Sequence, residues 1–222
     1  MKKILLLSTI LLLGLTAAIL PPAPPMPAPA AVQIPQAKEI LTISNDIKGV
    51  VIDGIRWATR NVDMPGTFAK SPENTGMLFQ WNRKKAWDTI DRDMSDWDRT
   101  TPEGTEWYAE NDPCPDGWRV PTREELQSLN NSGSVWAIYN EVYGRLFGVV
   151  PNQIFLPAVR NRGERWGLLN EVAFSSSSYW SSNIQRDTEA ACLRFHSVSV
   201  SVSWNRKGSA LSVRCVAESE NQ

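Results

Sequence analysis

Hydrophobic and polar residues alternate most regularly near the C-terminal end of the chain. From Val198 to Trp204 an apolar residue occupies every second position, and a serine stands at each position between. A period of two predicts a β-strand with one buried and one solvated face. The turn residues 205–208 follow, so we expect this strand to form a C-terminal antiparallel pair with the apolar strand 212–216.

Three other segments carry strand signals. Residues 49–57 enclose an Asp53-Gly54 pair, which favours a two-residue hairpin turn, and residues 153–157 form a short apolar run. Residues 135–147 fit a helical face as well as a hairpin, and their aromatic and β-branched side chains favour the hairpin. Each run is short and is separated from the next by long irregular loops.

One helix start is well marked. Thr122 and Glu125 have the spacing of a capping box, in which the hydroxyl accepts from the backbone N–H of Glu125 and the carboxylate reaches back to the amide of Thr122. The helix should continue through Leu126 and Leu129 and end near residues 130–133. Short antiparallel strands, one or two helices and long loops together predict an α+β domain.

The N-terminal region has the pattern of an export signal. Two lysines precede an apolar run at residues 4–20 that is short for a membrane span, so we interpret it as a secretory signal peptide rather than an uncleaved anchor. Cleavage is expected after Ala18 or, on the Ala-x-Ala pattern that we favour, after Ala30. Residues 21–35 contain seven of the fifteen prolines and form an extended spacer.

These boundaries divide the chain into four parts. They are the signal peptide with the start of the Pro-rich segment (1–30), a linker (31–47), one folded domain (48–218) and a tail (219–222). With the leader removed we expect no membrane span, and the product should reach the periplasm, the cell surface or the medium.

Composition and charge exclude several classes of protein. The 222 residues leave room for one domain plus a leader, and 42% hydrophobic with 21% charged residues is an ordinary globular balance. The formal net charge is −1, and it becomes −3 when the first thirty residues, which carry two lysines and no acid, are removed. A nucleic-acid partner is not expected, because such proteins usually show a basic surplus.

The sequence offers little for catalysis. The single histidine, His196, cannot build a site that needs two or three imidazoles, and the chain contains no dinucleotide, triphosphate or serine-hydrolase motif. We therefore expect neither an enzyme nor a cofactor. The acidic stretch 88–116 opens like a calcium loop at Asp91, but Asp96 stands where that loop needs glycine and Pro102 where it needs glutamate. A solvated loop without metal is favoured.

Export allows disulfides to persist. Cys114 lies in a turn-rich approach to the helix and Cys215 lies in the terminal strand, and we predict that these two form a disulfide. Closing a loop of about a hundred residues would contribute roughly 4 to 5 kcal/mol in the chain-entropy model. Cys192 is then expected to be a small buried hydrophobe.

Six short motifs, in this order, resemble the Fibrobacter succinogenes major paralogous domain family over about residues 48–218. They are residues 52–62, 76–82, 114–122, 154–158, 179–182 and 212–216. The resemblance implies a C-type lectin-like fold on a bacterial surface protein, often from gut Bacteroidota, in which a disulfide ties the helix region to the last strand.

Two departures from related patterns affect what the resemblance implies. Residues 140–142 replace a second glycine-rich turn, which weakens the hairpin assignment there. The Glu-Pro-Asn and Trp-Asn-Asp motifs of calcium-dependent lectins are absent from the sequence, so calcium-mediated sugar binding is not implied.

The favoured function is that of a non-catalytic adhesin-like module that recognises a glycan or protein ligand on a cell surface through its C-terminal loops. Trp204 fits such a contact surface as well as it fits the core, because it continues the apolar face of its strand. The candidate ligand-binding residues are Asn183, Gln185, His196, Trp204, Asn205 and Arg206.

Three alternatives stay open. The domain could be a structural or tip subunit of a surface appendage, held by an envelope partner. It could be a ligand-binding protein diversified by retroelement mutagenesis, as in some proteins of the same fold class. A hydrolase whose carboxylate pair comes from Glu164, Glu171 or the acidic stretch 88–116 is less favoured.

Overall fold

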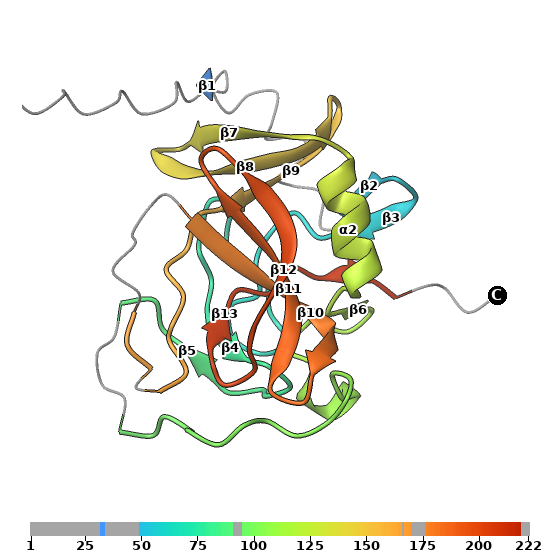
Figure 1. The fold of residues 1–222 in the computed structure, drawn as a ribbon. Helices are drawn as coiled ribbons and strands as arrows, with labels where there is room; N and C mark the ends of the chain where they lie inside the picture. Colours follow the sequence, from blue (N-terminus) through green and yellow to red (C-terminus); the bar gives the residue numbers. More distant parts are fainter. Residues whose placement is uncertain (1–31, 34–48, 91–94, 166, 170–175, 219–222) are drawn as a thin grey trace, which may run out of the picture.

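The computed structural model describes residues 32–33, 49–90, 95–165, 167–169 and 176–218 (Figure 1). The predicted signal peptide, nearly all of the linker and the tail lie outside the described residues. So do Asp91–Met94 of the calcium-like stretch and Glu171 of the suggested carboxylate pair.

The described chain forms four small sheets. The first has the strand order β1 (Val32–Gln33), β7 (Ser134–Tyr139), β8 (Val142–Val149), β9 (Asn152–Pro157), and the second β10 (Ser176–Arg186), β11 (Glu189–His196), β12 (Val200–Arg206). The third has the order β13 (Ala210–Leu211), β4 (Leu78–Gln80), β5 (Ala86–Trp87), and the fourth β2 (Val50–Ile52), β3 (Ile55–Trp57), β14 (Val216–Ala217), β6 (Trp118–Arg119). All paired strands are antiparallel except β1 and β7, which are parallel.

The predicted α+β class is wrong, because the described fold is mostly β-sheet. Its one α-helix is α2 (Arg123–Asn131), beside a single 3₁₀ turn, η1 (Ala109–Asn111). The segment that could have supplied a second helix forms the β7–β8 hairpin instead. Asn140 and Glu141 make its two-residue turn with φ of 46° and 67°. Two left-handed residues match the twist of flanking strands and stop any helix.

The predicted local signals at the helix and at the first hairpin are confirmed. The Thr122 hydroxyl accepts from the Glu125 amide at 3.2 Å, and the Glu125 carboxylate accepts from the Thr122 amide at 2.7 Å. Asp53 and Gly54 have φ of 50° and 80° and join β2 to β3. Both features depend on residues within four positions of each other, which is why the sequence predicts them.

The expected C-terminal antiparallel pair is wrong. Strand β12 pairs with β11, and the chain after its turn enters the interior, where β13 pairs with β4 and β14 pairs with β3 and β6. Residues 210–216 are all buried, so this segment needs neighbours on both sides. Strand β12 is half-exposed and stays at the edge of its sheet.

The predicted disulfide between Cys114 and Cys215 is confirmed, with their sulfur atoms 2.09 Å apart. It joins the loop before α2 to the residue preceding β14. Cys192 is a buried free cysteine, as expected. Burial raises the pKa of its thiol to about 12, so it behaves as a hydrophobe rather than as a nucleophile.

The second sheet separates two hydrophobic cores. Trp180 and Cys192 point into a core around the disulfide, whereas Tyr179, Leu193 and Phe195 point into a core beneath α2. Because neighbouring strand residues face opposite ways, β10 and β11 are buried on both faces. Strand β12 alone in this sheet is open to solvent along much of its length, and Figure 1 shows it in front of the sheet beside α2. No helix in the described part of the chain is long and apolar enough to cross a membrane.

Candidate functional site

Trp204 is the most exposed of the described tryptophans. Its exposed fraction is 47%, whereas the eight other described tryptophans are buried or half-buried. The alternative that Trp204 belongs to the core is therefore wrong. Val200 and Val202 precede it on the same strand face and pack partly against the core beneath α2. The predicted buried face of this strand is thus only half-buried, and it ends in an exposed indole.

The sheet register places small and charged side chains around this indole. Trp204 lies opposite Ala191 of β11, which is buried. Arg206, two positions further on the same face of β12, lies opposite Glu189, and Glu189 lies opposite Arg186 of β10. We call this surface the Trp204 face, and it consists of Val202, Trp204, Arg206, Ala191, Glu189 and Arg186.

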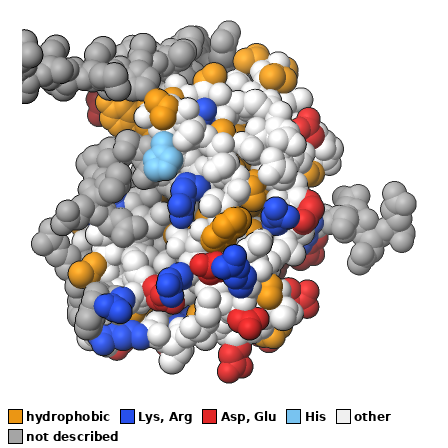
Figure 2. Space-filling view, in the orientation of Figure 1, with side chains coloured by type: hydrophobic (Ala, Val, Ile, Leu, Met, Phe, Trp, Pro, Cys, Tyr) orange, Lys and Arg blue, Asp and Glu red, His pale blue; other side chains and the backbone are white. Residues whose placement is uncertain are grey.

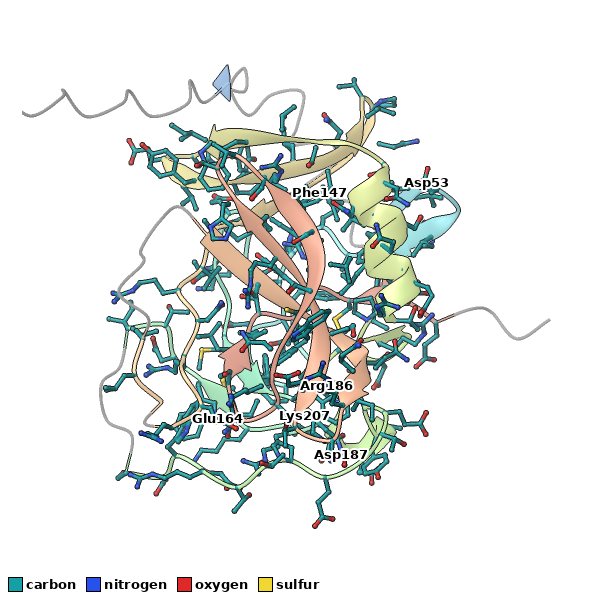
Figure 3. All side chains as sticks on the ribbon, viewed as in Figure 1. Asp53, Phe147, Glu164, Arg186, Asp187 and Lys207 are labelled. Carbon is teal, nitrogen blue, oxygen red and sulfur yellow. A yellow bond between two sulfur atoms is a disulfide. The ribbon has the colours of Figure 1, made fainter. Side chains whose placement is uncertain are left out.

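Two loose ion pairs border the Trp204 face. The Arg186 guanidinium lies 4.0 Å from the Glu189 carboxylate. The Arg206 guanidinium lies 3.5 Å from the carboxylate of Glu164, in the segment between β9 and β10. Figure 3 shows Arg186 and Glu164 toward one end of the sheet, and Figure 2 shows Lys and Arg side chains around a hydrophobic patch over β12. Glu164 therefore pairs with a cation, and the residue proposed as its catalytic partner lies outside the described residues.

The other predicted ligand residues divide into two groups. Arg206 belongs to the Trp204 face, and Gln185 is an exposed residue next to Arg186 in β10. Asn205 points to the opposite face of β12, where its side-chain oxygen accepts from the Arg206 amide at 2.9 Å and from the Ser209 hydroxyl at 3.5 Å.

Asn183 has a supporting role in the structure. Its side-chain oxygen accepts from the backbone N–H of Arg123 at 2.7 Å and so holds the first turn of α2 against β10. This bond satisfies one of the N–H groups that have no partner within a helix. Asn183 belongs to the wall of a cavity rather than to the Trp204 face.

His196 is exposed but lies apart from Trp204. It pairs with Ser176 at the far end of β11, five positions from the residue opposite Trp204. At the usual rise of a strand, this separation is roughly 17 Å. Figure 2 shows the single histidine at a distance from the hydrophobic patch over β12. One small ligand would not contact both side chains.

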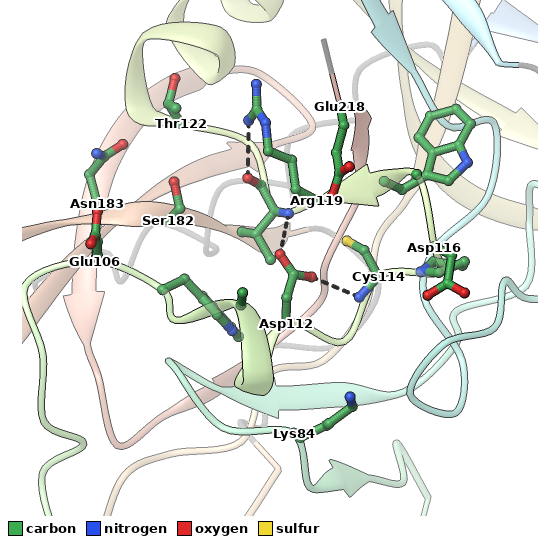
Figure 4. Close-up of a pocket in the computed structure, with 16 residues that line it drawn as sticks. Lys84, Glu106, Asp112, Cys114, Asp116, Arg119, Thr122, Ser182, Asn183 and Glu218 are labelled. Atoms are coloured by element: carbon green, nitrogen blue, oxygen red, sulfur yellow. Dashed lines mark hydrogen bonds between the residues drawn. The ribbon is translucent and has the colours of Figure 1, made fainter. Parts of the chain in front are cut away.

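A cavity of about 640 Å³ lies beside the disulfide, between η1, β6, β10 and the start of α2 (Figure 4). Asp112 projects into this region and accepts backbone hydrogen bonds from Cys114 at 2.8 Å and Val120 at 3.0 Å. Burial raises the pKa of Asp112, and these two bonds oppose that shift. Its carboxylate therefore organises the loop that carries the disulfide.

Arg119, another charged residue that lines the cavity, pairs with Glu125 of α2. Two hydrogen bonds of 2.7 and 2.9 Å join the guanidinium to the carboxylate. Hydrogen bonding to Glu125 raises the pKa of Arg119. Burial raises the pKa of Glu125, but the bonds from Arg119 and Thr122 outweigh it and leave that pKa below its ordinary value. This tight pair anchors the capping box, and the described residues contain no group of three or more His, Cys, Asp or Glu placed to hold a metal ion.

Compared with known proteins, the chain matches no family model, no curated protein and no solved structure.

Arg186 and Glu189 are the residues of the Trp204 face that sequence reasoning missed. They flank the β10–β11 turn and meet Arg206 only through the pairing of three strands. The period-two pattern ended at Trp204 and placed Arg206 in a turn, whereas β12 continues to Arg206, and the pattern carried no information about which strand would lie beside it.

Proposed function

We propose that the chain is a secreted or surface-exposed, non-catalytic binding module that contacts a glycan or protein ligand through the Trp204 face. The observation that carries this proposal is the 47% exposure of Trp204 on a well-packed sheet. An indole is a large apolar surface with one N–H donor, and exposed aromatic side chains of this kind dominate many binding energies.

The sheet beneath Trp204 supports a binding role because it is held in place from both sides. Strands β10 and β11 are buried in both cores, and the disulfide closes the core on one side of the sheet. A surface that is ordered before the ligand arrives loses less conformational entropy on binding. The face therefore favours recognition of a ligand by a preformed surface.

The sequence resemblance to the Fibrobacter succinogenes major paralogous domain family and the predicted signal peptide agree with this role. Both point to a chain that leaves the cytoplasm, where its ligand would be a cell-surface glycan or protein and its neighbours could include an envelope component. The signal peptide pattern and the Trp204 face are independent observations, since one comes from residues 4–20 and the other from the C-terminal strands.

A glycan array and a cell-binding assay on the full chain test the proposal. Trp204→Ala should weaken binding at least about tenfold, because the ring supplies most of the apolar contact. Tyr143→Ala is the matched control, since Tyr143 is also an exposed aromatic strand residue but lies in the first sheet. Its binding should be unchanged, and both variants should keep the disulfide and unfold cooperatively.

Three outcomes would count against the proposal. Equal binding by the Trp204→Ala variant and the original chain would remove the Trp204 face from recognition. Turnover of a polysaccharide or a model ester, abolished by a single Asp or Glu substitution, would show an enzyme. Stoichiometric co-purification with an appendage from cell envelopes would indicate a structural subunit.

A further inference from the structure

We infer that the ligand of the Trp204 face is a saccharide that carries a carboxylate, such as a uronic acid or a sialic acid. The inference rests on the proposed function and deepens it. It is argued from the exposed fractions of the charged side chains, from the distances within their ion pairs, and from the lack of other exposed apolar side chains beside Trp204 on this face.

The cations of the Trp204 face extend further into solvent than the anions do. The side chains of Arg186 and Arg206 are 71% and 65% exposed, whereas those of Glu189 and Glu164 are 24% and 25% exposed. An approaching ligand would therefore meet guanidinium groups first. The two arginines and the two glutamates balance in number, so the difference lies in which sign reaches solvent.

These guanidinium groups keep most of their hydrogen-bonding capacity. Their carboxylate partners lie at 4.0 and 3.5 Å, longer than the 2.7 to 2.9 Å typical of charge-assisted hydrogen bonds. By contrast, the Arg119–Glu125 pair of the same protein is joined by two hydrogen bonds of 2.7 and 2.9 Å. A ligand carboxylate could form a bidentate pair with Arg206 or Arg186 without breaking a short internal hydrogen bond.

The Glu189 carboxylate holds Arg186 only weakly. Its Oε2 atom is buried and has no hydrogen-bond partner among the described residues. The nearest cation to this oxygen is the Arg186 guanidinium at 4.0 Å, which is beyond hydrogen-bond distance, and a ligand cannot reach the oxygen while it is closed to solvent. The Arg186 guanidinium therefore stays available to a ligand carboxylate.

The indole favours a saccharide over an acidic peptide. On its face of β12, Trp204 lies between Val202, which is half-buried, and the exposed Arg206. Protein-binding surfaces usually gather several apolar side chains into one patch. A single flat ring bordered by polar groups fits the apolar C–H face of one pyranose ring.

Binding of the full chain to paired polysaccharides tests this inference. Polygalacturonate and its methyl ester have the same backbone but differ in charge, and a sialylated oligosaccharide supplies the other source of a sugar carboxylate. We expect one of the two acidic ligands to bind at least about tenfold more tightly than the methyl ester, with affinity that falls as salt rises. Arg206→Gln should remove this preference, and Lys70→Gln, which removes an exposed charge elsewhere, should not.

The outcomes separate the inference from the proposed function. Equal, Trp204-dependent binding of the methyl ester and of both acidic saccharides would overturn the carboxylate inference and leave the binding module intact. Polyglutamate binding as tightly as the acidic saccharides would overturn the saccharide assignment. Failure of every acidic saccharide to bind would overturn the inference. If no ligand bound the original chain more tightly than it bound the Trp204→Ala variant, the proposed function would be overturned as well.

Discussion

The Arg214 guanidinium donates two hydrogen bonds to the side-chain oxygen of Asn61, at 3.1 and 2.6 Å, in the interior of the protein. Its remaining bonds go to the carbonyls of Ala58 and Phe155. Burial lowers the pKa of Arg214 to about 10. One side chain therefore joins the segment after β3, strand β9 and the segment before β14, with neutral oxygens as its hydrogen-bond acceptors.

Asn61→Ala should destabilise the protein through this contact. The substitution leaves two guanidinium N–H groups of Arg214 buried without an acceptor, so the free energy of unfolding should fall by about 2 to 4 kcal/mol. Denaturant unfolding of the purified chain measures the change. Asn152→Ala, at an exposed position of β9, is the control and should change stability by less than about 0.5 kcal/mol. A loss below about 1 kcal/mol for Asn61→Ala would contradict this account.

Removing the disulfide should have a larger effect. It spans 101 residues, for which the chain-entropy model gives a stabilisation of roughly 4 to 5 kcal/mol. A Cys114→Ala, Cys215→Ala double variant should therefore unfold at much lower denaturant concentration, and reductant should lower the midpoint of the original chain but not that of the variant. Equal midpoints for the two oxidised proteins would show that the crosslink contributes little.

Alkaline pH should destabilise the fold through Cys192. Burial raises the pKa of its thiol to about 12, so above about pH 9 the unfolded chain loses this proton while the folded chain retains it. The free energy of unfolding should consequently fall with rising pH, by up to about 1.4 kcal/mol per pH unit. Unfolding curves between pH 8 and 10 measure the slope, and Cys192→Ala should reduce it. Burial also raises the pKa of Tyr179 to about 12, which extends the loss above pH 10.

Glu141→Gly should stabilise the β7–β8 hairpin. Glu141 has a φ of 67°, a conformation that glycine adopts without the steric cost of a Cβ atom. A gain of about 0.5 to 1 kcal/mol in the free energy of unfolding is expected. Glu141→Ala is the control, because it removes the carboxylate but keeps the Cβ atom. If the alanine variant gained as much as the glycine variant, the charge rather than the backbone would be responsible.

The sequence alone predicted the features that depend on neighbouring residues. The capping box of α2 needs only Thr122 and Glu125, and the β2–β3 turn needs only Asp53 and Gly54. Export and the two cysteine environments led to the disulfide, which the structure confirms. The alternation also placed Trp204 on the apolar face of its strand, although it did not predict that the ring is exposed.

Only the tertiary structure decided which strands pair and which faces stay open. The alternation from Val198 to Trp204 was compatible with pairing to the last strand, but burial of residues 210–216 placed that segment inside and left β12 beside β11. The same pairing brought Arg186 and Glu189 to Trp204. A strand pattern records which residues share a face, whereas the choice of partner depends on how the whole chain buries its apolar surface, and local sequence does not contain that information.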